Sequence, residues 1–179
     1  MITRLKNRLS RFRSEESGET YTLEFVVMFP VILATFAYGV ELTTHANRQF
    51  QLDHGFEVTT RAIRLNTATN FTHDDLKAGI CEFSGGLDEC ESRLRLEMTP
   101  VNPRDFAGLP TMPDCTNAPE PVTPVRGWSL GEQHELMLLR ACYKYDTVFN
   151  SFGLGSLLGN DAGGRGSMVS MSAFVQEPR

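Results

Sequence analysis

The sequence lacks the short motifs by which several classes of enzyme and metal protein are recognised. It has no nucleophile elbow and no phosphate-binding loop that ends in Gly-Lys-Ser or Gly-Lys-Thr. Its four cysteines include no CxxC pair and its four histidines are scattered, so no common metal-ligand spacing is present. We therefore expect no catalytic site, no metal and no cofactor, and we expect that the protein is not an enzyme.

Positive charge is in the minority. The chain has 17 Lys and Arg against 22 Asp and Glu, which gives a net charge of −5. A general nucleic-acid binder needs clustered Lys and Arg for phosphate contacts, so we expect no nucleic-acid partner. The exception to the acidic balance is the start of the chain, which carries five basic residues with no acid among them: Arg4, Lys6, Arg8, Arg11 and Arg13.

An uncharged apolar run follows this basic head. Residues 25–40 read FVVMFPVILATFAYGV, and a helix of about sixteen residues is about 24 Å long. A hydrocarbon core is about 30 Å thick, so the flanking Leu23 and Leu42 complete the expected span. The run is apolar on every face, which favours a membrane helix. A buried core helix and a cleavable secretory signal are the alternatives, although the YGVELT that follows lacks a small-x-small cleavage pattern.

Charge around the run predicts its orientation. Five basic residues precede it, whereas Glu41 and the isolated Arg48 follow it. The positive-inside rule therefore places the N-terminus in the cytoplasm. We expect a basic cytoplasmic head over residues 1–22, a transmembrane helix over 23–42 and an extracytoplasmic domain over 43–179. The expected location is the cell inner membrane, with membrane lipid as a partner and the C-terminal domain in the periplasm.

Two residues are unusual for a lipid-facing helix. Pro30 removes one backbone hydrogen bond, and we expect it to kink the helix between Phe25 and Pro30. Glu24 lies at the cytoplasmic edge of the run. Its carboxylate is either a boundary charge that reaches the interface or a functional group, since intramembrane carboxylates are costly and usually functional.

The sequence around Glu24 resembles the N-terminus of TadE-like proteins, the minor pseudopilins of tight-adherence pilus machines. Residues 15–30 read EESGETYTLEFVVMFP: an acidic patch, a Gly, a polar stretch, then Glu24-Phe25 and an apolar run that contains Pro30. Looser similarity covers most of the chain, including THDDLKAGICEF, SRLRLEM and MSAFVQEPR. The resemblance implies a pilin-like fold and a structural role in which the protein helps to initiate or anchor a pilus.

The resemblance also implies partners and site residues. In the wider family a prepilin peptidase cuts after the Gly, and a glutamate then pairs with the new terminal amine during assembly. Here the cut would separate Gly18 from Glu19, and the glutamate would be Glu24. Glu24 would be the sixth residue of the mature chain rather than the fifth, so a retained head is the alternative. The implied partners are other pseudopilins, pilus assembly proteins and the peptidase. A membrane-tethered periplasmic binding module with no pilus role is the alternative function.

Two helices are expected after the span. One runs over residues 41–67 with Gly55 at the point where a bend would fall, and the second begins after Thr72, which suits an N-cap. We expect Leu76, Ile80 and Phe83 on one face of the second helix, which ends at Gly85. The apolar stripe expected on the first helix is Leu42, Ala46, Phe50, Phe56 and Ile63.

Three segments alternate with the period of two that indicates half-buried strands. They are residues 94–98, 136–145 and 168–175, and the apolar faces expected for them contain Leu94, Met137 and Val169 respectively. Proline-rich residues 100–124 and glycine-rich residues 149–166 are expected to be loops, the second a flexible surface loop. The fold class is therefore α+β: a long helix packed on a small antiparallel sheet with one wet face.

The cysteines all follow the apolar run. An even number of cysteines on the oxidising side of a membrane suggests two disulfides, although four cysteines allow three pairings. Locality favours Cys81 with Cys90 and Cys115 with Cys142. A zinc site is the rival, and the absence of a CxxC pair disfavours it.

Overall fold

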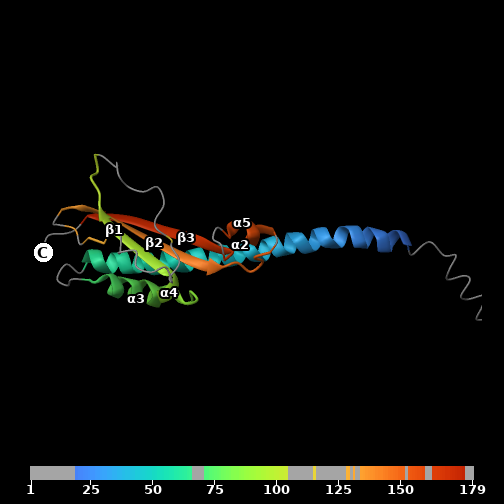
Figure 1. Ribbon diagram of the computed structural model, residues 1–179, viewed down its shortest axis with the longest axis horizontal. Coiled ribbons are helices and arrows are strands. Elements are labelled where there is room, and N and C mark those ends of the chain that lie inside the picture. Colours follow the sequence, from blue (N-terminus) through green and yellow to red (C-terminus); the bar gives the residue numbers. More distant parts are fainter. Residues whose placement is uncertain are drawn as a thin grey trace, which may run out of the picture. The chain divides into compact units, whose positions relative to one another are not determined.

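The computed structural model describes residues 19–65, 71–104, 115, 128–129, 131, 134–151, 153–159 and 163–175 (Figure 1). The chain divides into two compact units, Met1–Val40 and Glu41–Arg179. The α-helix α2, Glu19–Leu65, contributes residues to both units. The second unit contains all the other described elements and is an α+β domain.

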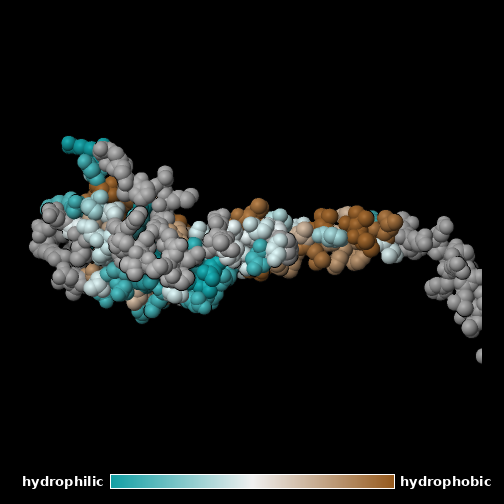
Figure 2. Space-filling view, viewed as in Figure 1, coloured by the Kyte–Doolittle hydropathy of each residue, from teal (hydrophilic) through white to brown (hydrophobic). Residues whose placement is uncertain are grey.

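The first unit is described over its helical part. Residues 21–40 of α2 leave most of their side chains exposed, and Figure 2 shows the hydrophobic surface that results. The helix continues through Pro30. Thr35, the strongly polar side chain within the apolar run, donates its hydroxyl proton to the carbonyl of Val31 at 2.9 Å, so its polar group is satisfied within the helix.

The sheet of the second unit is antiparallel and has the order β1-β2-β3. Its strands are β1 (Leu94–Pro100), β2 (Leu136–Asp146) and β3 (Arg165–Val175). Leu96 lies opposite Ala141, which lies opposite Ser170 on the other side. Trp128 forms an isolated parallel bridge with Met98, beside the outer edge of β1. The three expected strands and the α+β class are confirmed.

One face of the sheet packs against α2 and α3 (His73–Ser84). In β2 the buried residues of this face follow the predicted alternation, because every second side chain points to the same side of a strand. The helices contribute Leu52, Phe56, Ile63, Leu76 and Ile80, and β2 contributes Met137, Leu139, Ala141, Tyr143 and Tyr145.

Local signals explain where α3 begins and ends. Thr72 and Asp75 form a reciprocal capping box, in which each side chain accepts a hydrogen bond from the other residue's backbone N–H. Gly85 ends the helix in the left-handed region at φ 67°, where a side chain would be strained. The short helix α4, Cys90–Arg93, then leads directly into β1.

The expected apolar stripe of α2 is partly wrong. Leu42 and Phe50 are 59% and 69% exposed, whereas Leu52, which falls off that stripe, is fully buried. The buried side chains of α2 include the polar Glu41 before Leu52, and after it the apolar Phe56 and Ile63 together with Thr59 and Thr60. Phe83 of α3 is likewise exposed, and Ser84 takes its place in the buried face.

The expected face of β3 is also wrong. Met171 and Val175 are 63% and 50% exposed, while Met168 and Phe174 are buried. The register explains this, because Met168 pairs with Tyr143 and Phe174 with Met137, both on the buried face of β2.

The far face of the sheet is not simply wet. Arg140 and Cys142 on that face are buried. Arg140 donates a hydrogen bond to Glu97 at 2.7 Å, and Cys142 is bonded to Cys115. A buried ion pair and a disulfide therefore occupy the middle of the face that was expected to meet water.

The glycine-rich stretch was expected to be a loop without regular structure. Residues Gly153–Leu158 instead form the short helix α5. Gly155 is buried, and a Cβ at this position would collide with the carbonyl oxygen of Phe149. The glycine therefore permits the backbone of α5 to pack closely on the turn that precedes it.

Candidate functional site

The described residues contain one helix that is long and apolar enough to cross a membrane, and none of its most apolar window is buried. Phe25 is 61% exposed, and its ring stacks on that of Phe29 at a centroid distance of 5.0 Å. Glu24 and Pro30 lie in the same part of α2, each with an exposed side chain. Because this apolar part of α2 has no buried side, its surroundings are better explained by lipid than by the core of a soluble domain.

The expected cleavage site falls at the limit of the described residues. Gly18 lies outside them, and Glu19 is the first residue of α2. The junction between Gly18 and Glu19 therefore stays a prediction.

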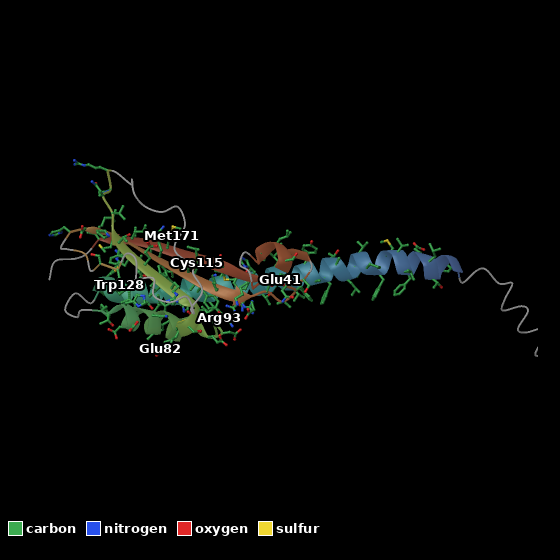
Figure 3. The ribbon with its side chains drawn as sticks, in the orientation of Figure 1. Glu41, Glu82, Arg93, Cys115, Trp128 and Met171 are labelled. Carbon is green, nitrogen blue, oxygen red and sulfur yellow. A yellow bond between two sulfur atoms is a disulfide. The ribbon has the colours of Figure 1, made fainter. Side chains whose placement is uncertain are left out.

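The first residue after the apolar run forms an unpredicted polar site. Glu41 is 1% exposed. Its Oε1 accepts a hydrogen bond from the backbone N–H of Val148 at 3.2 Å, and its Oε2 accepts one from Phe149 at 3.0 Å. These two donors come from the turn that follows β2, and Figure 3 shows Glu41 on α2 near α5. A buried carboxylate with two charge-assisted hydrogen bonds fixes this turn to the helix.

One turn further along α2, His45 and Arg48 contact the end of β2. The Nδ1 of His45 lies 2.8 Å from the hydroxyl oxygen of Tyr145. The guanidinium of Arg48 lies 5.4 Å from the centroid of the Tyr145 ring and donates a hydrogen bond to the carbonyl of Asp146 at 2.8 Å. Burial raises the pKa of Tyr145, and the nearby Glu41 carboxylate raises it further.

Asp146 joins three elements at this end of the domain. Its carboxylate pairs with Arg93 of α4 at 2.6 Å and with Arg165 of β3 at 3.3 Å. The hydrogen bond from Arg93 is the main reason that the pKa of Asp146 lies below its ordinary value. The same hydrogen bond raises the pKa of Arg93. We call Glu41, His45, Arg48, Tyr145 and Asp146 the polar clamp.

The polar clamp was missed because the face expected to pack was an apolar stripe that begins at Leu42 and contains none of the clamp residues. A signal was nevertheless present. Positions 41, 45, 48 and 52 recur at helical spacing, and this is the set that α2 presents to the sheet. Local periodicity does not reveal that the partners of Glu41 lie more than a hundred residues away, on the backbone of Val148 and Phe149.

A groove of about 580 Å³ lies between the later part of α2 and strand β3. Acidic side chains line the part of α2 nearer the clamp, and basic ones line the part nearer Leu65. The exposed Met171, labelled on β3 in Figure 3, borders it. The groove-lining residues of α2 are Asp53, Phe56, Glu57, Thr60, Arg61, Arg64 and Leu65.

Both disulfides are present in the pairs that locality favoured. Cys81 of α3 is bonded to Cys90 at the start of α4, with their Cα atoms 5.6 Å apart. Cys115 is bonded to Cys142 of β2, with a Cα separation of 5.5 Å. Within the described ranges, no group of three or more His, Cys, Asp or Glu side chains is arranged to hold a metal ion.

Comparison with known proteins adds no relative. No family model matches the chain, and no match was found among curated proteins or solved structures.

Proposed function

We propose that the protein is a membrane-anchored assembly component of a tight-adherence pilus machine. It would be a minor-pseudopilin-like protein that helps to initiate or anchor the fibre. The observation that carries this proposal is the exposed apolar part of α2, with Glu24-Phe25 at its start and a basic head before it in the sequence. Tyr21 and Phe36 are 77% and 71% exposed, and such a surface is stabilised when lipid or a neighbouring helix covers it.

The architecture of the domain supports an assembly role. The helix α2, which contains the apolar segment, also contributes Leu52, Phe56 and Ile63 to the domain core. A long N-terminal helix against a small antiparallel sheet is the general plan expected of a pilin-like protein. The proposed orientation places the basic head in the cytoplasm and the disulfide-bonded domain in the periplasm, where disulfides form and persist.

Deletion of the gene from its host tests the proposal. We expect pili to disappear from electron micrographs, and the full-length gene to restore them. Normal piliation in the deletion strain contradicts the assembly role.

Mass measurement of the purified protein decides processing: a mature chain that begins at Glu19 indicates cleavage, and a chain that retains the segment up to Gly18 indicates a permanent anchor.

One observation favours the alternative function, a membrane-tethered periplasmic binding module with no pilus role. The groove beside β3 combines acidic Asp53 and Glu57 with basic Arg61 and Arg64. A concave site whose few polar groups converge is where a ligand would bind with a fixed orientation. Neighbouring genes separate the two functions, because a secretion ATPase and a prepilin peptidase beside this gene support assembly.

A further inference from the structure

We infer that α5 and the turn before it contact the surface of the membrane in which α2 is anchored. This inference rests on the proposed membrane anchor. The partner is the lipid layer at the boundary between head groups and acyl chains. The surface that meets it, called the apolar lip here, consists of Val148, Leu154, Leu157 and Leu158.

The composition of this segment is unusual for a connection between two strands. Residues 147–160 contain no Asp, Glu, Lys, Arg or His, but they include three leucines, two phenylalanines and a valine. Turns of a water-exposed domain are normally polar. Leu157 is 72% exposed and Val148 is 46% exposed, so much of this apolar surface is not used by the domain core.

The arrangement within α5 is amphipathic. Leu154, Leu157 and Leu158 stand at positions i, i+3 and i+4, which share one face of a helix. Gly155 lies on the other side, buried against the turn that precedes α5. A short helix with one side packed and the other apolar presents a surface that suits an interfacial element.

Hydrogen bonds fix where this surface lies in the domain. Val148 and Phe149 donate their backbone N–H groups to Glu41. A Cβ on Gly155 would lie 3.1 Å from Oε2 of the same carboxylate. Both the turn and α5 therefore lie directly against Glu41.

The position of Glu41 identifies the partner. Glu41 follows Val40, the last residue of the apolar run, and lies within the expected span of residues 23–42. Its carboxylate must then be near the membrane boundary, and any group within hydrogen-bond distance of it must be near that boundary too. The carboxylate of Glu41 accepts hydrogen bonds from backbone N–H groups, and these bonds offset the loss of water around it at the boundary. The apolar lip consequently meets lipid rather than bulk water.

Tryptophan fluorescence of the full-length protein in lipid nanodiscs tests the inference. Leu157→Trp places a probe on the apolar lip, and the parent protein with its single Trp128 supplies the baseline. Leu65→Trp is the matched control, because Leu65 is 73% exposed and lies at the other end of the domain part of α2, about 36 Å from Glu41 along the helix. Phe36→Trp reports on the anchor itself.

We expect lipids brominated near the head group to quench the added emission of Leu157→Trp about twofold and to leave that of Leu65→Trp unchanged. Quenching of Phe36→Trp without quenching of Leu157→Trp would overturn the inference and leave the anchor intact. Absence of quenching at both positions would overturn the anchor as well. A blue-shifted but unquenched Leu157→Trp signal would assign the lip to a protein partner and would equally refute lipid contact. Equal quenching of Leu65→Trp would also overturn the inference, because the contact would then not be specific to the apolar lip.

Discussion

The Oε2 of Glu41 accepts a hydrogen bond from the backbone N–H of Phe149 at 3.0 Å, although 108 positions separate the two residues in the sequence. This bond joins the helix at the end of the apolar run to the turn between β2 and α5. It forms where Glu41 is 1% exposed, so the carboxylate has little access to bulk water. Within the second unit, the turn after β2 is thereby fixed to the first residue that α2 contributes to that unit.

Glu41→Ala should destabilise the domain. The substitution removes the carboxylate that accepts hydrogen bonds from two part-buried backbone N–H groups, and this loss costs about 1–3 kcal/mol in the free energy of unfolding. Glu41→Gln keeps one carbonyl oxygen as an acceptor and should cost less. Denaturant unfolding in detergent measures both changes. Glu82→Ala, at an exposed carboxylate on α3 (Figure 3), is the control and should change the free energy by less than about 0.5 kcal/mol. Equal stability of the Glu41→Ala and Glu82→Ala proteins would show that the buried carboxylate does not hold the turn.

Gly55→Ala should also be destabilising, for a steric reason. A Cβ at Gly55 would lie 2.5 Å from Oγ and 2.8 Å from N of Ser84, and it would collide with the carbonyl oxygen of Ile80. Because two helical backbones approach each other here, we expect a loss of about 1–3 kcal/mol from overpacking. The thermal midpoint measures the loss.

Gly79→Ala is the matched control at the same helix pair. Its Cβ would meet only the side chain of Thr59, at 3.3 Å from Cγ2, and alanine favours the helix by up to about 1 kcal/mol. We expect this variant to be near neutral. If Gly55→Ala is as stable as Gly79→Ala, the two helices do not need a glycine at their crossing.

Removal of each disulfide should cost stability in proportion to the loop that it closes. The sequence separations are 9 for Cys81–Cys90 and 27 for Cys115–Cys142. Loop-closure entropy then predicts losses of about 2.7 and about 3.6 kcal/mol for the paired alanine substitutions. Guanidinium unfolding measures the losses, and peptide mapping without reductant identifies the bonds. Peptides that link Cys81 to Cys142 would contradict both pairs.

Acid should weaken the contact between Asp146 and Arg93. The pKa of Asp146 is lowered in the folded protein from its ordinary value of 3.8. The ionised form is therefore favoured by folding, so this contribution to stability is present above about pH 4 and is lost as pH falls through the folded pKa. Asp146→Asn should flatten the dependence of the denaturation midpoint on pH below 4, and unchanged pH dependence would contradict the assignment. The effect should be small, because the Asp146 side chain is 61% exposed.

Glu24→Ala should leave membrane insertion intact and impair assembly. The alanine adds no charge to the span, so carbonate extraction should still find the protein in the membrane fraction. In the proposed assembly role, the Glu24 carboxylate would pair with a terminal amine in lipid, and its loss should reduce piliation about tenfold, the equivalent of about 1.4 kcal/mol. Glu24→Asp separates charge from side-chain length. Normal piliation of Glu24→Ala would remove Glu24 from the assembly site.

Sequence reasoning located the strands and the start of α3 because their signals are local. Leu94, Leu96 and Met98 alternate with polar residues, and Thr72 with Asp75 is a capping pair that a reader of the sequence can recognise. The same reasoning failed where the burial of a side chain depends on pairing with a strand that is distant in the sequence. In β3 both alternating sets contain apolar side chains, and only pairing with β2 selects Met168 and Phe174 for the core.

The candidate sites also divide into those that local sequence reveals and those that depend on residues distant in the sequence. The apolar segment around Phe25 and Pro30 is visible in composition alone, and so is the pairing of neighbouring cysteines such as Cys81 and Cys90. The role of Glu41 was not visible, because its donors are the backbone N–H groups of a turn that was read as a flexible loop. The glycine-rich residues 149–166 were expected to form a flexible surface loop, whereas Gly155 allows α5 to pack closely on the turn that precedes it.

The oxidation state of Cys115 and Cys142 reports the compartment in which the domain folded. Thiols that stay in a reducing cytosol remain free, whereas those that reach an oxidising compartment become linked. Alkylation of unfolded protein from intact cells, before and after a reductant, therefore reports which side of the membrane the domain reached. A population with four blocked thiols before reduction would consist of molecules whose C-terminal domain never crossed.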